Sequence, residues 1–364
     1  MRGRGKARLV AGVALLLLLL SACADNLKQS TLNPAGPVAE KQKDLFDLVF
    51  WIAVVVFVLV EGVLVLAIVR YRHRKGNAIP EQTHGNLRLE IAWTIVPTVL
   101  LAGLAVPAVA TVYDLAKEPK GPDVLNVRVV GHQWWWEFDY PDLGITTANQ
   151  MHIPEDTPVF IELSAVGATK GGTPVGIPGS KEPPPAVGFA VIHSFWPARL
   201  AGKTDVVPGR TNTMTIEGSE PGVYPDQCAE FCGLSHTLMR FEVIVDTQDG
   251  FDSWVRKNQA DAVDPTDPLA RKGMEVFAGE GCIACHSVDG AELDGKPFAG
   301  IGGPNMTHFG SRTCFAGCFL QNHPDTVKRW VRDPPALKPG SFMPDYALTE
   351  DQIDAVVAYL ETLQ

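Results

Sequence analysis

The chain has 364 residues, is 46% hydrophobic and carries a formal net charge of −10. This acidic balance argues against nucleic acid as a partner, because phosphates bind basic surfaces, and the apolar content excludes disorder as the main state. The net charge is +5 for residues 1–113, −10 for residues 114–264 and −5 for residues 265–364. Together with a mean hydropathy of +0.06, this division predicts a basic membrane part followed by two acidic soluble parts.

Residues 1–23 have the features of a lipoprotein-type signal peptide. Basic residues precede the apolar run 9–20, which is too short to span a membrane. Ser21 and Ala22 come before Cys23, and small residues in front of a cysteine resemble the bacterial signal in which that cysteine receives lipid. The alternative is an uncleaved membrane anchor with an incidental cysteine.

A transmembrane hairpin is predicted over residues 40–113. Its apolar runs, 48–69 and 91–112, are each long enough to cross a hydrocarbon layer of about 30 Å. The loop between them, 70–90, holds most of the positive charge of this region. The positive-inside rule therefore places that loop in the cytoplasm and the later domains on the extracytoplasmic side of a bacterial cell membrane. A charge within a span usually faces protein or water, so Glu61 is a candidate contact with a partner subunit.

A β-rich domain, predicted as a sandwich or barrel, occupies residues 120–248. Apolar and polar residues alternate over 124–130, 211–216 and 240–245, turns rich in Gly and Pro separate these runs, and no long helical pattern lies between them. The Gly/Pro-rich segment 171–185 is predicted to be a surface insertion.

A group of soft metal ligands lies within this domain. Cys228, Cys232, His236 and Met239 fall within twelve residues, and sulfur with imidazole selects copper or zinc. A disulfide between the two cysteines would leave the histidine and the methionine without a role, a zinc site would not need the thioether, and a single blue copper needs only one cysteine. A pair of copper ions bridged by two thiolates fits better, with His193 on an earlier apolar strand as the second histidine.

The last part of the chain contains a c-type haem attachment signal. Residues 249–266 are predicted to be a linker, and residues 267–364 a separate domain. This domain contains the sequence Cys282-Ile-Ala-Cys285-His286. Two thiols at this spacing add to haem vinyl groups, and the adjacent histidine is placed to bind the iron. A closing helix is predicted after the capping box that begins at Thr349.

The chain resembles subunit II of a haem–copper cytochrome c oxidase over roughly residues 40–248. The shared features are the two spans, the Gly-His-Gln-Trp-Trp-Trp sequence at 131–136, the segment around His193, the Gly-Lys-Thr-Asp-Val-Val-Pro-Gly-Arg sequence at 202–210, and the copper loop. The Cys-x-Glu-x-Cys-x3-His-x2-Met spacing of that loop is highly specific. The resemblance implies an all-β cupredoxin sandwich that holds the binuclear copper centre CuA.

The resemblance also implies roles for single residues. The Glu230 carboxylate would face a magnesium ion at the border with subunit I. The implied copper ligands are His193 and Met239 for one ion, His236 and the backbone carbonyl of Glu230 for the other, and Cys228 and Cys232 as bridges between both.

Two further roles follow from the same family. Trp134 would lie on the route by which electrons reach the copper, and Glu90 would stand at the entrance of a proton pathway into subunit I. One departure concerns Ala190, because the family usually has aspartate three residues before the first histidine ligand. This departure weakens any acidic docking site for a soluble cytochrome.

The C-terminal domain resembles a class I cytochrome c, which implies an all-α fold. In that family the second iron ligand comes from a loop before the final helix, which favours Met343 over Met274 and Met306. The Pro304 carbonyl would accept a hydrogen bond from His286 and so fix its tautomer. The remaining pair is predicted to form a disulfide between Cys314 and Cys318, with a metal site that includes His308 and His323 as the alternative.

The fused arrangement resembles subunit II of a caa3-type oxidase. It implies that electrons pass from an upstream donor, such as a cytochrome c or a bc-type complex, to haem c, then to CuA and on to haem in subunit I. Subunits I and III would be partners, and oxygen would be reduced to water in subunit I with proton pumping. One alternative is a membrane-anchored electron shuttle or copper-delivery protein. Another is a nitrous oxide reductase, but nine histidines are too few for its second copper cluster and the chain is too short for its propeller domain. A quinol oxidase subunit II is excluded because it lacks the copper loop.

Overall fold

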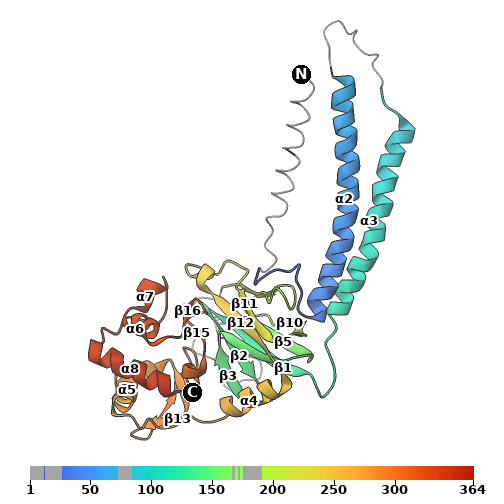
Figure 1. Ribbon diagram of the computed structural model, residues 1–364. Helices are drawn as coiled ribbons and strands as arrows, with labels where there is room; N and C mark the ends of the chain where they lie inside the picture. Colours follow the sequence, from blue (N-terminus) through green and yellow to red (C-terminus); the bar gives the residue numbers. More distant parts are fainter. Residues whose placement is uncertain (1–11, 13–26, 73–83, 166–168, 171–172, 175–190) are drawn as a thin grey trace.

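A computed structural model describes residues 12, 27–72, 84–165, 169–170, 173–174 and 191–364. Three parts follow one another along the chain, and the β domain lies between a pair of long helices and a helical C-terminal domain (Figure 1). Apart from residue 12, the predicted signal peptide lies outside the described residues, as do Cys23, Ala190 and most of the Gly/Pro-rich insertion.

Two helices form the predicted hairpin, α2 over Pro37–Tyr71 and α3 over Leu87–Leu115 (Figure 1). Both are long and apolar enough to cross a membrane. They extend beyond the apolar runs because helical hydrogen bonding continues into their polar ends, where the Asn86 side chain caps α3. The Lys41 Nζ and Asp114 Oδ2 atoms lie 2.6 Å apart and join the two helices near the β domain.

The β domain is a sandwich of a five-stranded and a three-stranded sheet, ordered β10-β5-β1-β2-β3 and β11-β12-β4. Alternating residues of the facing strands are buried, because successive side chains of a strand point to opposite faces. The rings of Trp136, Phe195 and Phe241 pack together in the core. The strands are β1 Leu125–His132, β2 Trp135–Tyr140, β3 Ile145–Ala148, β4 Gln150–Pro154, β5 Val159–Ala165, β10 Asn212–Ile216, β11 Gly222–Gln227 and β12 Arg240–Asp246, with the ribbons β6 Thr169–Lys170 with β7 Thr173–Pro174 and β8 His193–Phe195 with β9 Thr204–Val206.

The predicted linker 249–266 differs from expectation in its first half. Residues Gln248–Asn258 form helix α4, which packs on the sandwich. Phe251 is buried, and the Trp254 ring stacks on His152 with centroids 4.7 Å apart. The sequence did not predict this helix, because its few apolar residues form only one narrow stripe along it.

The C-terminal domain is helical, with short ribbons added to the expected all-α fold. The capping box at Thr349 is confirmed, since its side chain and that of Gln352 cap α8 reciprocally. Helices α5 and α8 cross at Gly273, where a Cβ atom would lie 1.9 Å from the Ala355 carbonyl oxygen. The elements are α5 Pro268–Gly279, β13 Ser287–Leu293, β14 Lys296–Ala299, β15 Cys314–Phe315, β16 Leu320–Gln321, α6 Pro324–Arg332, α7 Pro334–Leu337 and α8 Glu350–Thr362, with 3-10 turns at Cys282–Ala284 and Phe309–Ser311.

Candidate copper and haem sites

The copper-ligand candidates converge at one end of the sandwich. The loop between β11 and β12 supplies most of them, and β8 supplies His193. The Cys228 and Cys232 sulfurs lie 3.9 Å apart, and Cys228 Sγ lies 3.9 Å from His193 Nδ1. Cys232 Sγ lies 3.6 Å from His236 Nδ1 and 3.8 Å from Met239 Sδ. The fold thus brings two thiols, two imidazoles and a thioether together in one cluster.

The cluster is buried and tightly enclosed. His193, Cys228, Cys232 and Met239 are each no more than 3% exposed. At Gly131 a Cβ atom would approach the His193 ring to 2.8 Å, so only glycine leaves room for this histidine. The close contact with Cys232 lowers the pKa of the Cys228 thiol, an effect larger than the opposing one of burial. The pair therefore readily provides a thiolate.

This donor set fits copper better than other metals. Thiolates, imidazoles and a thioether are soft or borderline ligands, and the Cys228 sulfur also lies 3.3 Å from the Glu230 carbonyl oxygen. A cluster with this many protein donors differs from a catalytic metal site, which keeps one position open for a substrate. Such a centre suits electron transfer.

Asp226, just before the copper loop, is a buried acid that no pattern in the sequence indicated. It is 2% exposed, and its Oδ1 accepts a hydrogen bond from the Ala198 amide, while its Oδ2 has no partner among the described residues. Burial raises the pKa of Asp226 to about 8. The folded domain thus holds a neutral carboxyl group near pH 7.

Replacing Asp226 by asparagine should stabilise the β domain near neutral pH. The pKa of Asp226 is higher in the folded state than in the unfolded state. Its stabilising contribution is therefore complete only below about pH 4, and it is lost as the pH rises toward 8. We expect Asp226→Asn to gain on the order of 2 kcal/mol of unfolding free energy at pH 7.5 and little at pH 4. Denaturant unfolding followed by tryptophan fluorescence measures this, and an equal difference at both pH values would contradict it.

The haem candidates line a single cavity in the C-terminal domain. Cys282 and Cys285 are free thiols, and together with His286 and Met343 they face this cavity. His286 Nδ1 lies 2.8 Å from the Pro304 carbonyl oxygen, the contact expected for the tautomer that leaves Nε2 available. Burial lowers the pKa of His286, which keeps its ring neutral, as a metal ligand requires.

The residues present fit a covalently bound haem. Aromatic and aliphatic side chains such as Phe277 and Leu360 line the cavity. Arg312 also lines it, and its buried Nε atom has no partner among the described residues. A buried cation without a counter-ion is unfavourable, and a haem carboxylate would supply one. Met306 lines the same cavity as Met343, whereas Met274 does not belong to the lining.

Trp134 joins the two sites. It belongs to the copper domain, is 6% exposed, and lies in the wall of the haem cavity. Its Nε1 donates a hydrogen bond of 2.9 Å to the Cys232 carbonyl oxygen, and its ring stacks on Phe342 with centroids 6.1 Å apart. Because Phe342 precedes Met343, the haem domain covers this tryptophan next to its own candidate iron ligand.

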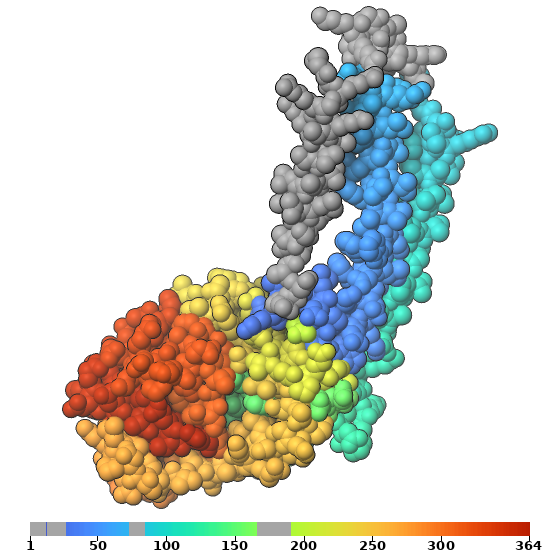
Figure 2. Space-filling model, in the orientation of Figure 1, coloured from blue at the N-terminus to red at the C-terminus, as the bar shows by residue number. Residues whose placement is uncertain are grey.

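The two domains are in direct contact along this face (Figure 2). Lys338, 3% exposed, donates hydrogen bonds to the carbonyl oxygens of Trp134 and Ala316 at 2.5 and 2.6 Å. Burial lowers the pKa of Lys338 to about 7. Ser235, on the copper loop, donates to the Pro339 carbonyl at 2.6 Å. The segment that leads to Met343 is thereby fixed to the copper loop.

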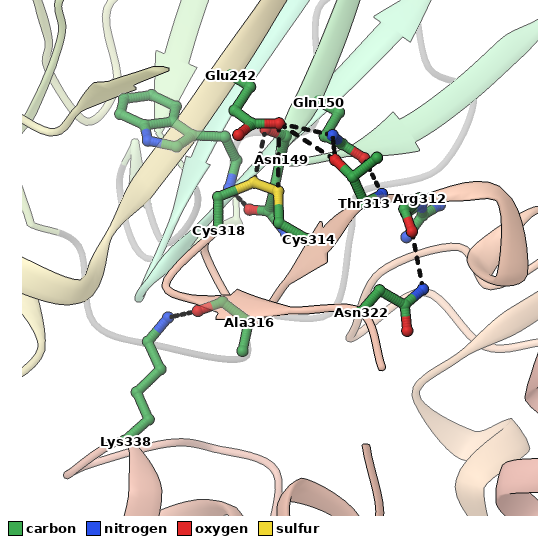
Figure 3. Close-up of a disulfide and its surroundings, with 11 residues drawn as sticks. Asn149, Gln150, Glu242, Arg312, Thr313, Cys314, Ala316, Cys318, Asn322 and Lys338 are labelled. Carbon is green, nitrogen blue, oxygen red and sulfur yellow. Dashed lines mark hydrogen bonds between the residues drawn. A yellow bond between two sulfur atoms is a disulfide. The ribbon is translucent and has the colours of Figure 1, made fainter. Parts of the chain in front are cut away.

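A disulfide between Cys314 and Cys318 lies on the same boundary (Figure 3). Its hairpin is held to the sandwich through Gln150, which donates to Thr313 Oγ1 and accepts from the Thr313 amide. The Glu242 carboxylate accepts a hydrogen bond from Thr313 Oγ1 at 3.4 Å, and it lies 3.7 Å from Cys314 Sγ. This hairpin and the segment at Lys338 both link the haem domain to the copper domain.

Glu90 belongs to the first turn of α3, and Figure 1 draws the start of that helix at the end of the hairpin opposite the soluble domains. Its carboxylate accepts a hydrogen bond from the Asn86 amide at 3.2 Å. This contact is local to the first turn of α3, and the predicted proton-pathway role remains a prediction.

The fold and the sites define a membrane-anchored electron carrier, with a cupredoxin that has a two-thiol copper site and a class I cytochrome c. Family models described as "Cytochrome C oxidase subunit II, transmembrane domain", "Cytochrome C oxidase subunit II, periplasmic domain" and "Cytochrome c" match residues 25–111, 125–247 and 270–364. The chain belongs to the cytochrome c oxidase subunit II family and is a component of a haem–copper oxidase, with a cytochrome c domain at its C-terminal end.

Curated relatives agree along nearly the whole chain. "Cytochrome c oxidase subunit 2" of Alkalihalophilus pseudofirmus is 36% identical over 97% of this chain and 96% of the relative. The protein of the same name from Bacillus sp. (strain PS3) is 38% identical over 98% and 97%. "Quinol oxidase subunit 2" of Bacillus cereus is 31% identical but covers only 68% of this chain and 78% of its own length. The predicted family and fold class are confirmed.

Proposed function

We propose that this chain receives electrons at a covalently bound haem c and passes them through CuA to haem in subunit I, where oxygen is reduced to water with proton pumping. The single observation that carries this route is the position of Trp134, which lines the haem cavity and donates a hydrogen bond to the carbonyl of Cys232. One side chain thus contacts both sites. A shuttle or a copper-delivery protein would not need a haem domain fixed to its copper loop.

The residues divide the work as follows. The copper would be held by the cluster around Cys228 and Cys232, and the haem by its two thioether bonds, by His286 and by Met343. These groups supply one-electron chemistry with closed coordination. Lys338 and Ser235 hold the Phe342 ring against Trp134, so that the distance between the centres stays short and constant.

Several finer assignments belong to the same proposal. The Glu230 carboxylate faces a magnesium ion shared with subunit I, and Glu90 opens a proton pathway into that subunit. The basic loop between α2 and α3 lies in the cytoplasm, and the soluble domains lie outside the cell membrane, with Cys23 as lipid anchor. Subunits I and III are the membrane partners, and a cytochrome c or a bc-type complex is the donor.

The test uses the intact complex, purified from membranes through this chain. We expect an oxygen-reducing partner to copurify, and electron paramagnetic resonance to show a multiline signal from one electron shared by two coppers. After anaerobic mixing with reduced cytochrome c, haem c should be reduced before the copper. A chain that purifies without an oxidase, or a four-line signal of a single copper, contradicts the proposal.

A further inference from the structure

A second cavity, of about 310 Å³, lies at the junction of the sandwich, helix α4 and the haem domain. It is separate from the copper cluster and adjoins the haem cavity through Arg312, which lines both. Most of the residues that line it have polar side chains. The residues are Thr147, Gln150 and His152 from the sandwich, Gly250, Ser253, Trp254, Lys257 and Asn258 from α4, and His308, Ser311 and Arg312 from the haem domain.

The charge of this cavity is positive. Among the described residues that line it, Lys257 and Arg312 are cationic and none is acidic. Two carboxylates on the neighbouring strand β12 already have partners, since Asp246 lies 2.7 Å from the His152 ring and Glu242 accepts from Gln150. This contrasts with the soluble part as a whole, whose net charge is −15.

His308 is the clearest sign that this cavity binds a ligand. It is 8% exposed, and neither of its ring nitrogens has a hydrogen-bond partner among the described residues. Buried polar groups are nearly always paired, and leaving one unpaired costs about 1–3 kcal/mol. The two unpaired ring nitrogens of His308, on the wall of this cavity, therefore point to a hydrogen-bonding ligand within it.

Cations line the cavity from both sides of the domain boundary. Lys257 stands on the α4 side, whereas Arg312 stands on the haem-domain side. Like charges brought together at a contact oppose docking. An anion between them would reverse the sign of this interaction and would join both sides through charge-assisted hydrogen bonds.

We propose that this cavity binds a phosphate-type oxyanion that bridges the haem domain to α4. The cavity has room for such an ion with several waters, since one water occupies about 30 Å³ of liquid volume. Hydroxyl and amide groups of Ser253, Asn258 and Ser311 around the basic side chains suit a tetrahedral ion with several acceptor oxygens. Binding at this site would strengthen the contact that keeps the haem domain on the copper domain.

The experiment measures binding of inorganic phosphate to the intact holo-complex by calorimetry, at constant ionic strength set with chloride. We expect saturable binding of one phosphate per chain. His308→Phe and Lys257→Gln should each weaken it about ten-fold, because a hydrogen bond to a charged group contributes about 1.5–3 kcal/mol. Lys272→Gln, at an exposed position of α5 outside the cavity lining, is the matched control and should bind as the wild type does.

The variants from the two sides separate a bridge from a one-sided site. His308→Gln keeps a hydrogen-bond donor and should recover much of the affinity that His308→Phe loses. The haem absorption spectrum reports whether each variant folds, and Lys257 is an exposed side chain whose replacement leaves the core untouched. Absence of saturable phosphate binding, or full affinity in either His308→Phe or Lys257→Gln, would overturn the proposal, whether or not electrons reach the copper.

Discussion

Replacing Cys232 by serine is expected to abolish electron transfer from haem c to the copper site. Its sulfur is the centre of the cluster, within 4 Å of the Cys228 sulfur, His236 Nδ1 and Met239 Sδ. A serine hydroxyl is a hard donor that stays protonated near pH 7, so it cannot replace a thiolate between soft metal ions. We expect a loss larger than the roughly 10- to 100-fold that follows removal of an outer partner of a metal ligand.

The matched control is Cys318→Ser combined with Cys314→Ser, which removes two sulfurs outside the copper cluster. In Cys232→Ser, reduced cytochrome c should still reduce haem c, whereas the multiline copper signal and oxygen consumption should be lost. The control should keep the multiline signal. Retention of that signal in Cys232→Ser would show that the two sulfurs do not both bind copper.

The grouping of the candidate copper ligands could be predicted from sequence because most of them lie within a single loop. The spacing from Cys228 to Met239 is fixed by the chain itself, and only His193 had to come from another strand. The haem attachment sequence is equally local. Chemistry carried by short segments leaves a readable pattern, because the residue types and their spacing are both set by the metal or the cofactor.

The contact between the two soluble domains could not be predicted in the same way. Lys338 lies 204 residues from Trp134, whose carbonyl it binds, and nothing near either residue in sequence indicates this pairing. The sequence did not predict helix α4, because its stripe of apolar residues is short. It also did not indicate Arg312, which resembles an ordinary surface cation in the sequence but lines two cavities in the fold. Long-range contacts depend on the finished surfaces of both domains, which local patterns do not encode.

Truncation of Trp134 to leucine should slow haem-to-copper electron transfer while leaving both centres in place. The change removes the indole hydrogen bond to the Cys232 carbonyl and the aromatic stack on Phe342. The stack on Phe342 crosses the domain boundary and contributes about 0.5–1.5 kcal/mol, whereas the Cys232 carbonyl keeps a second donor, Gln133 Nε2, at 2.8 Å. Loss of the stack should therefore lower the docked population and the rate about two- to ten-fold. Flash reduction of haem c, followed by the absorbance of both centres, measures this rate.

Trp134→Phe distinguishes the two contributions. It keeps an aromatic ring against Phe342 but loses the hydrogen bond to the Cys232 carbonyl, so its rate should lie between those of Trp134→Leu and the wild type. The absorption of haem c and the multiline copper signal should be unchanged in both variants, because Trp134 provides no ligand to either centre. If Trp134→Leu transferred electrons as fast as the wild type, the route from haem to copper would have to leave the haem domain elsewhere. The contact at Lys338 and Phe342 would then position the domains without carrying electrons.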